Sequence, residues 1–407
     1  MDKKRIIFAI AFALITVGLG FLLYRLFFTT STIIDDTPLG EEDTTGTGSF
    51  PIAGEGGTRV TTTPPTTLPP RDERNPVGGS FVPRERPLVT QVVTDFLQSP
   101  VPSQNGGVQY YNNQDGRFYR LRTDGTPELL TDEVFYNVQK VNWSPTAQDA
   151  ILEYPDGSNI YYNFATKKQA TIPKHWEEFS FSQENGKIAA KIMGQSRENK
   201  WLTIANADGT SATLVEPLGD NADKVTVDWS PNRQVVAFSR TGEGLGDDRE
   251  EILLVGANGE NFRSLVVEGR GFQSRWSESG QKLVYSVYNT NSNFKPELWV
   301  VNAEGDSVGS GRTPLQINTW AEKCTFQDDR FIYCGIPTRL ETGAGFAPEL
   351  SDSTPDTLWR IDTQTGAKNE VTLDSTNHVI GTITVGEDGQ TLYFTDKLQP
   401  GLFKVEI

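Results

Sequence analysis

The chain has 407 residues, with 38 Gly, 23 Pro, 22 Phe, 12 Tyr and 8 Trp but only 2 His, 2 Cys and 2 Met. This length fits two ordinary domains or one larger all-β domain with appendages, and the abundance of aromatic and turn-forming residues favours the second. The formal net charge of -16 repels phosphates and anionic headgroups, which argues against nucleic acids and acidic lipid surfaces as natural ligands.

The first element is an apolar segment at residues 6–24, IIFAIAFALITVGLGFLLY, which carries no charge over 19 residues. As a helix it is long enough to cross a bilayer. Three basic residues precede it and only Arg25 follows, so the positive-inside rule leaves residues 1–5 in the cytoplasm. We expect an uncleaved signal anchor at residues 6–28, with a cleaved signal peptide as the alternative. The protein is then a single-pass protein of the cell membrane.

Residues 29–86 are rich in Thr, Pro and Gly and include TTTPPTTLPP. Apolar residues recur there with no regular period, so burial could not offset the entropy of ordering the segment. We expect a disordered tether that holds a domain at residues 87–407 away from the membrane, on its extracytoplasmic side.

Six similar segments follow in that domain. They are VNWSPTAQDAILEY from Val141, FSFSQENGKIAAKI from Phe179, VDWSPNRQVVAFSR from Val227, SRWSESGQKLVYSV from Ser274, CTFQDDRFIYCGIP from Cys324 and ITVGEDGQTLYFTD from Ile383. The anchor positions of these segments are Trp143, Phe181, Trp229, Trp276, Phe326 and Val385. Their separations, 38 to 59 residues, are close to the length of a four-stranded propeller blade.

A second pattern lies between successive anchors. A strand such as KWLTIANADG or ELWVVNAEG ends at a tight turn, where Gly or Asn supplies a positive φ, and a short apolar run usually follows. One repeat therefore reads as an inner strand, two middle strands and an outer strand, which is one blade.

The motif W-S-x-D-G before three apolar residues resembles the WD40-like (PD40) repeats of TolB-type β-propellers, over roughly residues 90–407. Its Asp-Gly pair is intact only at Asp388 and Gly389. We predict an all-β propeller of seven blades, in which the segment at residues 86–96 completes the last blade; six blades is the alternative. The resemblance suggests an envelope assembly or scaffold.

We find no catalytic motif in the sequence. A G-x-S-x-G elbow is absent, and the only histidines, His175 and His378, lie between repeats, where we expect surface connections. The acidic segments at residues 218–224 and 241–251 lack the spacing of a calcium-binding loop. We therefore predict no enzymatic activity, no cofactor and no metal site.

Cys324 and Cys334 flank the turn QDDR of one predicted hairpin, directly opposite each other if the strands pair around Asp329. We expect them to form a disulfide in an oxidising compartment, with two buried thiols as the alternative.

The loop after this hairpin, at residues 336–356, is longer than its equivalents and mixes Arg339, Phe346 and Leu350 with acidic residues. Long loops of compact repeat proteins are often functional, so these three residues are the candidate partner-binding residues. The loop at residues 289–296 is expected on the same face.

We interpret the protein as a non-catalytic platform for other proteins of the cell envelope. One alternative is a glycan receptor, which requires exposed aromatic and amide residues in one groove; Trp201, Trp299 and Trp359 are its candidates, although packing between blades is favoured for them. A less favoured alternative is an enzyme with a carboxylate site in the channel.

Overall fold

The computed structural model describes residues 87–407 except 105, 185, 261 and 374–376. The expected transmembrane helix at residues 6–28 and tether at residues 29–86 lie outside the described residues. Within the described part, no helix is long and apolar enough to span a bilayer.

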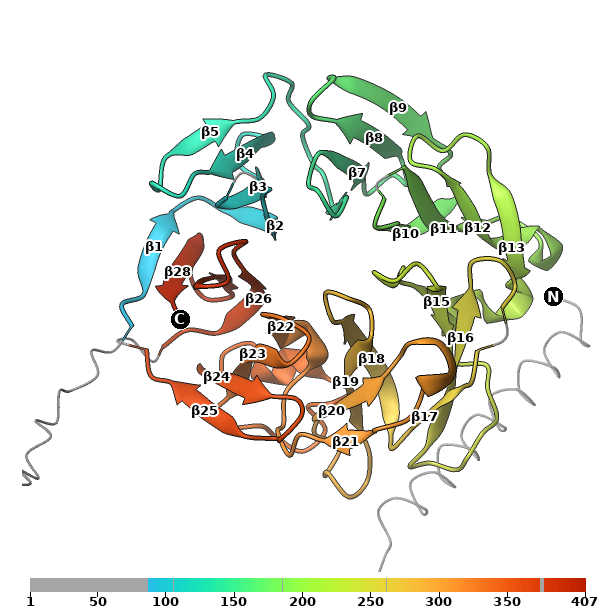
Figure 1. Cartoon of the computed structure of the whole chain (residues 1–407). Helices are drawn as coiled ribbons and strands as arrows, with labels where there is room; N and C mark the ends of the chain where they lie inside the picture. Colours follow the sequence, from blue (N-terminus) through green and yellow to red (C-terminus); the bar gives the residue numbers. More distant parts are fainter. Residues whose placement is uncertain (1–86, 105, 185, 261, 374–376) are drawn as a thin grey trace, which may run out of the picture. The chain divides into compact units, whose positions relative to one another are not determined.

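Seven four-stranded antiparallel sheets form a ring, and each sheet is one blade (Figure 1). Blade 1 contains β2 (Leu97–Pro102), β3 (Val108–Asn112), β4 (Arg117–Leu121) and β5 (Pro127–Leu129). Blade 2 contains β6 (Lys140–Trp143), β7 (Asp149–Glu153), β8 (Asn159–Asn163) and β9 (Lys168–Ile172). Blade 3 contains β10 (Trp176–Phe181), β11 (Lys187–Met193), β12 (Lys200–Asn206) and β13 (Thr213–Pro217).

The next three blades repeat this order from the centre outward. Blade 4 contains β14 (Val225–Val227), β15 (Val235–Ser239), β16 (Glu250–Gly256) and β17 (Leu265–Val267). Blade 5 contains β18 (Arg270–Trp276), β19 (Lys282–Tyr288), β20 (Glu297–Asn302) and β21 (Thr313–Pro314). Blade 6 contains β22 (Cys324–Phe326), β23 (Phe331–Pro337), β24 (Asp356–Asp362) and β25 (Lys368–Val371). Short 3₁₀ helices lie in connections: η1 (Arg197–Asn199), η2 (Gly219–Lys224), η3 (Gly305–Ser307), η4 (Ala321–Lys323) and η5 (Pro348–Ser351).

Blade 7 joins the two ends of the described chain. It contains β26 (Ile380–Val385), β27 (Thr391–Asp396) and β28 (Leu402–Glu406), with β1 (Thr90–Val93) as its outer strand. Thr90 pairs with Lys404 and Val93 with Leu402. The prediction of seven blades closed by an N-terminal strand is therefore confirmed, and closure removes the free sheet edges of an open ring.

The anchors of the repeats lie at the ends of the innermost strands. Trp143, Phe181, Trp276, Phe326 and Val385 are the last residues of their strands, and Trp229 follows β14 by two residues. Each anchor packs into a different one of the seven apolar clusters that join neighbouring blades.

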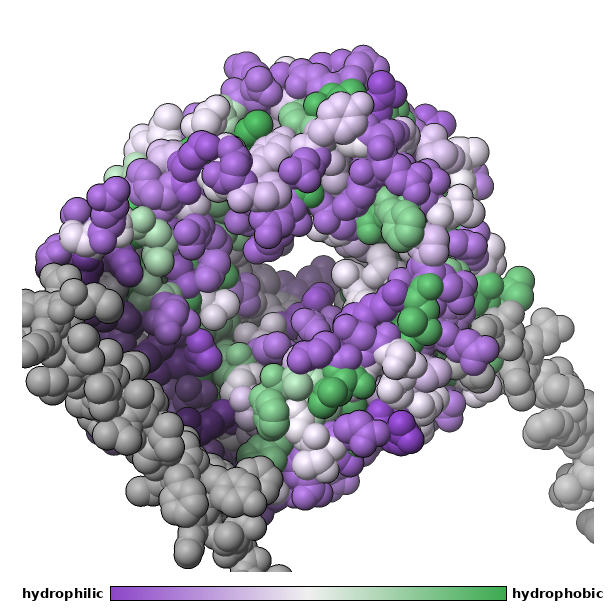
Figure 2. Space-filling model, turned by 180° about the vertical axis from the view of Figure 1, so that it is seen from behind, coloured by the Kyte–Doolittle hydropathy of each residue, from purple (hydrophilic) through white to green (hydrophobic). Residues whose placement is uncertain are grey.

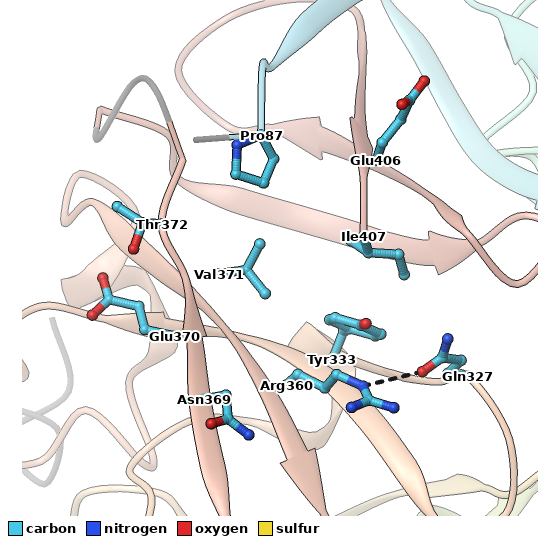
Figure 3. Close-up of a pocket in the computed structure, with 10 residues that line it drawn as sticks. All are labelled: Pro87, Gln327, Tyr333, Arg360, Asn369, Glu370, Val371, Thr372, Glu406 and Ile407. Carbon is cyan, nitrogen blue, oxygen red and sulfur yellow. Dashed lines mark hydrogen bonds between the residues drawn. The ribbon is translucent and has the colours of Figure 1, made fainter. Parts of the chain in front are cut away.

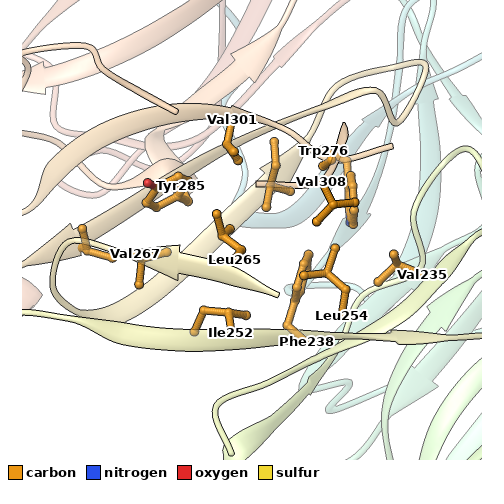
Figure 4. Packing of buried hydrophobic residues seen from close by; sticks show 13 residues of the cluster. Val235, Phe238, Ile252, Leu254, Leu265, Val267, Trp276, Tyr285, Val301 and Val308 are labelled. Atoms are coloured by element: carbon orange, nitrogen blue, oxygen red, sulfur yellow. The ribbon is translucent and has the colours of Figure 1, made fainter. Parts of the chain in front are cut away.

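Figure 4 shows the cluster between blades 4 and 5, where Phe238 and Trp276 stack with ring centroids 5.4 Å apart. The core of the propeller is thus divided among the interfaces between blades, and removal of one aromatic anchor weakens one interface.

The turn after the anchor explains why the repeat motif carries Ser and Gly. In blade 4, Oγ of Ser230 accepts a hydrogen bond from the backbone N–H of Val235 at 2.9 Å. Four residues after the anchor the backbone takes a left-handed φ in four of the repeats, at Gly280 (73°) and Gly389 (64°) but also at Ala147 (55°) and Arg233 (66°). This conformation costs a non-Gly residue about 1 kcal/mol. The cost is small enough that the turn also forms in repeats that have another residue in place of the glycine.

The antiparallel order places the connections on two faces of the ring. One face carries two kinds of connection: those between the second and third strands of a blade, and those that lead from the fourth strand to the next blade. We call this the upper face. The remaining connections lie on the lower face. Because β1 runs antiparallel to β28, the described chain begins near the lower face.

Candidate functional site

Four consecutive blades contribute loops to a continuous surface on the upper face. We call it the loop ridge, and it consists of the loops between second and third strands of blades 4 to 7, at residues 240–249, 289–296, 338–355 and 397–401. The sequence-predicted pair of loops, at residues 289–296 and 336–356, is part of it.

Hydrogen bonds and an ion pair join each loop of the ridge to the next. The backbone N–H and Oγ1 of Thr290 donate to Oδ1 of Asp248 at 3.1 and 2.8 Å. The N–H of Gly345 donates to the carbonyl of Phe294 at 2.7 Å. Lys397 pairs with Asp352 at 2.5 Å. These contacts fix the loops relative to one another, and those from Thr290 also hold the pKa of Asp248 below its usual value.

Exposed apolar side chains gather on the loop ridge. Eleven large hydrophobic residues are exposed in the described part of the chain, and five of them lie on these four loops. They are Leu245, Phe294, Phe346, Leu350 and Leu398. Figure 2, which shows the molecule from behind relative to Figure 1, displays separate hydrophobic patches around a central opening in a mostly hydrophilic surface.

The three sequence-predicted residues of the long loop are all at the surface. Phe346 is 61% exposed and Leu350 is 49% exposed, whereas Arg339 extends into solvent and pairs with Glu341 at 3.1 Å. The ring of Phe346 contacts that of Phe294 edge-on, with centroids 5.9 Å apart. The two loops therefore present their aromatic rings together.

Sequence reasoning missed Phe294, Leu245 and Leu398 as surface residues of this site. Each occupies the second loop of its blade, so alignment of the loops by their position within the repeat would have grouped them with Phe346. The contact of Phe294 with Phe346 carries no sequence signal, because it joins residues of different repeats.

The base of the long loop is anchored by a buried ion pair. Lys323 in η4 contacts both carboxylate oxygens of Asp356 at 2.7 and 2.8 Å, and both side chains are at least 96% buried. The N–H of Ile380 also donates to Asp356 at 2.7 Å. Burial raises the pKa of Asp356, and Lys323 opposes this shift. The start of β24 is thereby fixed to blade 7.

The two cysteines lie just below this anchor. Cys324 and Cys334 are directly opposite in the pairing of β22 with β23, with their Cα atoms 4.1 Å apart, and their sulfurs are bonded. The disulfide joins the inner two strands of blade 6, the blade that carries the long loop.

The histidines occupy different environments. His175 is exposed, as expected of a surface connection. His378 was expected there too, but it is 5% exposed, because its ring packs against Phe394 and Phe403 and its Nδ1 lies 2.8 Å from Asp396. Over the described residues, no three His, Cys, Asp or Glu side chains are grouped to hold a metal ion.

The three tryptophans of the glycan alternative are partly buried. Trp299 and Trp359 pack against the clusters on either side of blade 5. The indole N–H of Trp201 donates to the carbonyl of Glu198 at 2.8 Å. Packing between blades thus accounts for much of the surface of Trp299 and Trp359.

A cavity of about 900 Å³ lies between blades 6 and 7, with Arg360 and Tyr333 pointing into it (Figure 3). Arg360 packs over the ring of Phe331 at 3.6 Å and donates to Gln327 at 3.3 Å, so its guanidinium is held in place. Such a group can bind a carboxylate. Glu406 on the rim opposes an anion, which leaves the cavity with mixed charge.

Solved structures of known proteins resemble this chain in fold. No family model matches the chain, and no curated protein matches it. An oligogalacturonate lyase in complex with manganese is similar over 78% of this chain and 93% of its own, with a TM-score of 0.55 and 13% identity. Oligogalacturonate lyase from Vibrio parahaemolyticus has a TM-score of 0.52 and 11% identity over 78% of this chain and 93% of its own.

A streptogramin B lyase structure is similar over 79% of this chain and 98% of its own, with a TM-score of 0.50 and 12% identity. These structures are propellers like this chain. At such identity the likeness shows the fold and leaves the TolB-type resemblance a prediction.

Proposed function

We propose that the propeller is a non-catalytic platform that binds another protein through the loop ridge. The observation that carries this proposal is the gathering of five of the eleven exposed large hydrophobic residues on four interconnected loops. Exposed apolar side chains concentrated on neighbouring loops are typical of a surface that a partner covers.

The loop ridge is preorganised for binding. Its loops are held to one another before any partner arrives, so binding requires little further ordering. Phe346 contacts the ring of Phe294 and is the most exposed of the five residues, at 61%. It is the expected anchor, because aromatic residues carry a large share of the energy in protein interfaces.

Charge indicates the kind of partner. Residues 87–407 carry 28 Lys and Arg against 43 Asp and Glu, a net charge of -15. A segment with apolar side chains flanked by Lys or Arg is complementary to such a molecule, and the charge would speed its association. The proposed partner is therefore a basic protein segment.

The proposed location is the extracytoplasmic side of the cell membrane, with residues 6–28 as the anchor. The uncharged run at residues 6–24 and the basic residues before it support this orientation. A disulfide between the only two cysteines also suits an oxidising compartment.

Catalysis is the competing proposal, since structures similar in fold are named as lyases. It would require a set of acid and base groups around a cavity. The buried contact of His378 with Asp396 is shielded by two phenylalanine rings, which favours a structural role for that pair. A turnover screen of the full chain tests this alternative directly.

Site-specific photo-crosslinking in intact cells tests the platform. A photoreactive phenylalanine analogue at Phe346 of the full chain is expected to give one reproducible protein adduct, and the same analogue at Leu214 is the control. Leu214 is similarly exposed, at 51%, but lies on the outer strand of blade 3. The double variant Phe346→Ala/Leu350→Ala should lose the co-purifying partner while remaining folded.

Equal adducts from both positions, or co-purification that survives the double variant, would contradict the proposal. Recovery of polysaccharide without protein would favour the glycan receptor instead.

A further inference from the structure

A groove between blades 5 and 6 gathers positively charged side chains, although the protein as a whole is acidic. The groove has a volume of about 750 Å³, and Lys295, Arg339 and Lys368 all line it. They come from three separate segments: one loop of blade 5, one loop of blade 6 and the outer strand of blade 6. No Asp or Glu lines the groove, although the propeller has 15 more acidic than basic residues.

The remaining wall of the groove combines apolar side chains, which include Trp359, Ile317 and Leu340, with the amides of Gln316 and Asn318. Trp359 lies in it, and its indole N–H donates to Oγ1 of Thr357 at 2.8 Å, which fixes the ring. Asn318 donates from its side-chain amide to the carbonyl of Pro296 at 3.0 Å, which fixes the amide in place. Gln316 is exposed beside it.

The backbone of Gln316 is strained. Its φ is 53°, in the left-handed region that a Gln seldom adopts. Nζ of Lys368 donates to the carbonyl of Gln316 at 3.2 Å, so the lysine holds this conformation and lies at the groove at the same time. Strained residues gather at binding sites more than elsewhere.

We propose that this groove binds an oligosaccharide that carries carboxylate groups. Three cations spread along one groove suit a ligand with negative charges at intervals, and each can form a charge-assisted hydrogen bond to a carboxylate. An indole offers an apolar face to a sugar ring, and the amides of Gln316 and Asn318 can bond to hydroxyl groups. Glu341, which pairs with Arg339 at 3.1 Å, is the nearest opposing charge. Lys295 and Arg339 also belong to loops of the loop ridge, but Phe346, the proposed centre of the protein contact, does not line the groove.

Titration of the full chain with an oligomannuronate tests the proposal, with a neutral glucose oligomer of equal length as the comparison. The acidic oligomer is expected to bind and the neutral one to bind much more weakly. The double variant Lys295→Gln/Lys368→Gln should weaken binding at least about tenfold, since two charge-assisted hydrogen bonds to the ligand are lost.

The matched control is Lys174→Gln/Lys224→Gln, which makes the same change in net charge at exposed positions away from the groove. It should leave the affinity unchanged. Equal losses in the two double variants would overturn the site, because only the overall charge would then matter. Polyglutamate of matched charge is the last arm, and equally tight, equally lysine-dependent binding of this peptide would overturn the assignment to a saccharide.

Discussion

Asp228 is a half-buried carboxyl group where the innermost strands of blades 4 and 5 meet. Burial raises its pKa to about 7, although the charge of Arg275 opposes the shift. Because the folded state holds this proton more tightly than the unfolded state, the group adds stability that is fully present below pH 4 and is lost as the pH rises through 7.

We predict that wild type loses stability relative to Asp228→Asn as the pH rises from 4 to 8. Between these two pH values, the unfolding free energy of wild type should fall relative to that of Asp228→Asn by an amount on the order of 1–3 kcal/mol. This is less than the full pKa shift implies, because water near the central opening screens the charge. Urea unfolding of both proteins at several pH values measures it. A difference that instead moves in favour of wild type over this range would mean that Arg275 lowers the pKa of Asp228 overall.

At the scale of single residues, the sequence indicated type and spacing but not environment. Trp143 and its equivalents were found because they recur with the blade. His378 was misplaced because its partners, Asp396 and the rings of Phe394 and Phe403, come from later strands of blade 7. One isolated histidine has no period that would indicate such a setting.

At the scale of elements, the hairpin of β22 and β23 shows that a local sequence pattern can predict strand pairing. Pairing around the QDDR turn was enough to place Cys324 opposite Cys334. The innermost strand of blade 1, β2, was not identified, since Pro100 and Pro102 interrupt its pattern and it has no aromatic anchor. The number of blades could still be predicted, because the other six repeats resemble one another and the strands before them make up a seventh blade.

We predict that Cys324→Ala/Cys334→Ala lowers the unfolding free energy by about 2–3 kcal/mol, the loop-closure entropy of a bridge that spans 10 residues. Denaturant unfolding of variant and wild type gives the difference, and wild type under reductant should lose a similar amount. If reductant leaves wild type unchanged while the variant is destabilised, the loss comes from the cavity left by the two sulfur atoms. Binding to the loop ridge should persist in the variant at low denaturant.

At the scale of the whole molecule, closure by β1 makes the ring complete. A chain that begins at Asp95 lacks this strand and leaves the backbone of β28 unpaired at the rim of blade 7. We predict that it aggregates or self-associates, because an uncovered strand edge pairs with other chains. Light scattering should separate it from a chain that begins at Pro87. A monomeric, equally stable shorter chain would show that β1 is dispensable.

The arrangement of the candidate site was only partly accessible from sequence. Loop length identified the segment with Phe346, and the repeat placed its neighbour at residues 289–296 on the same face. The groove of Lys295, Arg339 and Lys368 could not be predicted, since it depends on the gap between two blades rather than on any one segment.

The position of β1 has a mechanical consequence. The chain enters β1 at the lower face, whereas the loop ridge lies on the upper face. Tension between a partner on the ridge and the chain before Pro87 therefore acts along the strand direction. It loads the backbone hydrogen bonds between β1 and β28 in shear, so that these bonds share the force instead of breaking one at a time. The strand that closes the ring is also the part through which tension would enter the propeller.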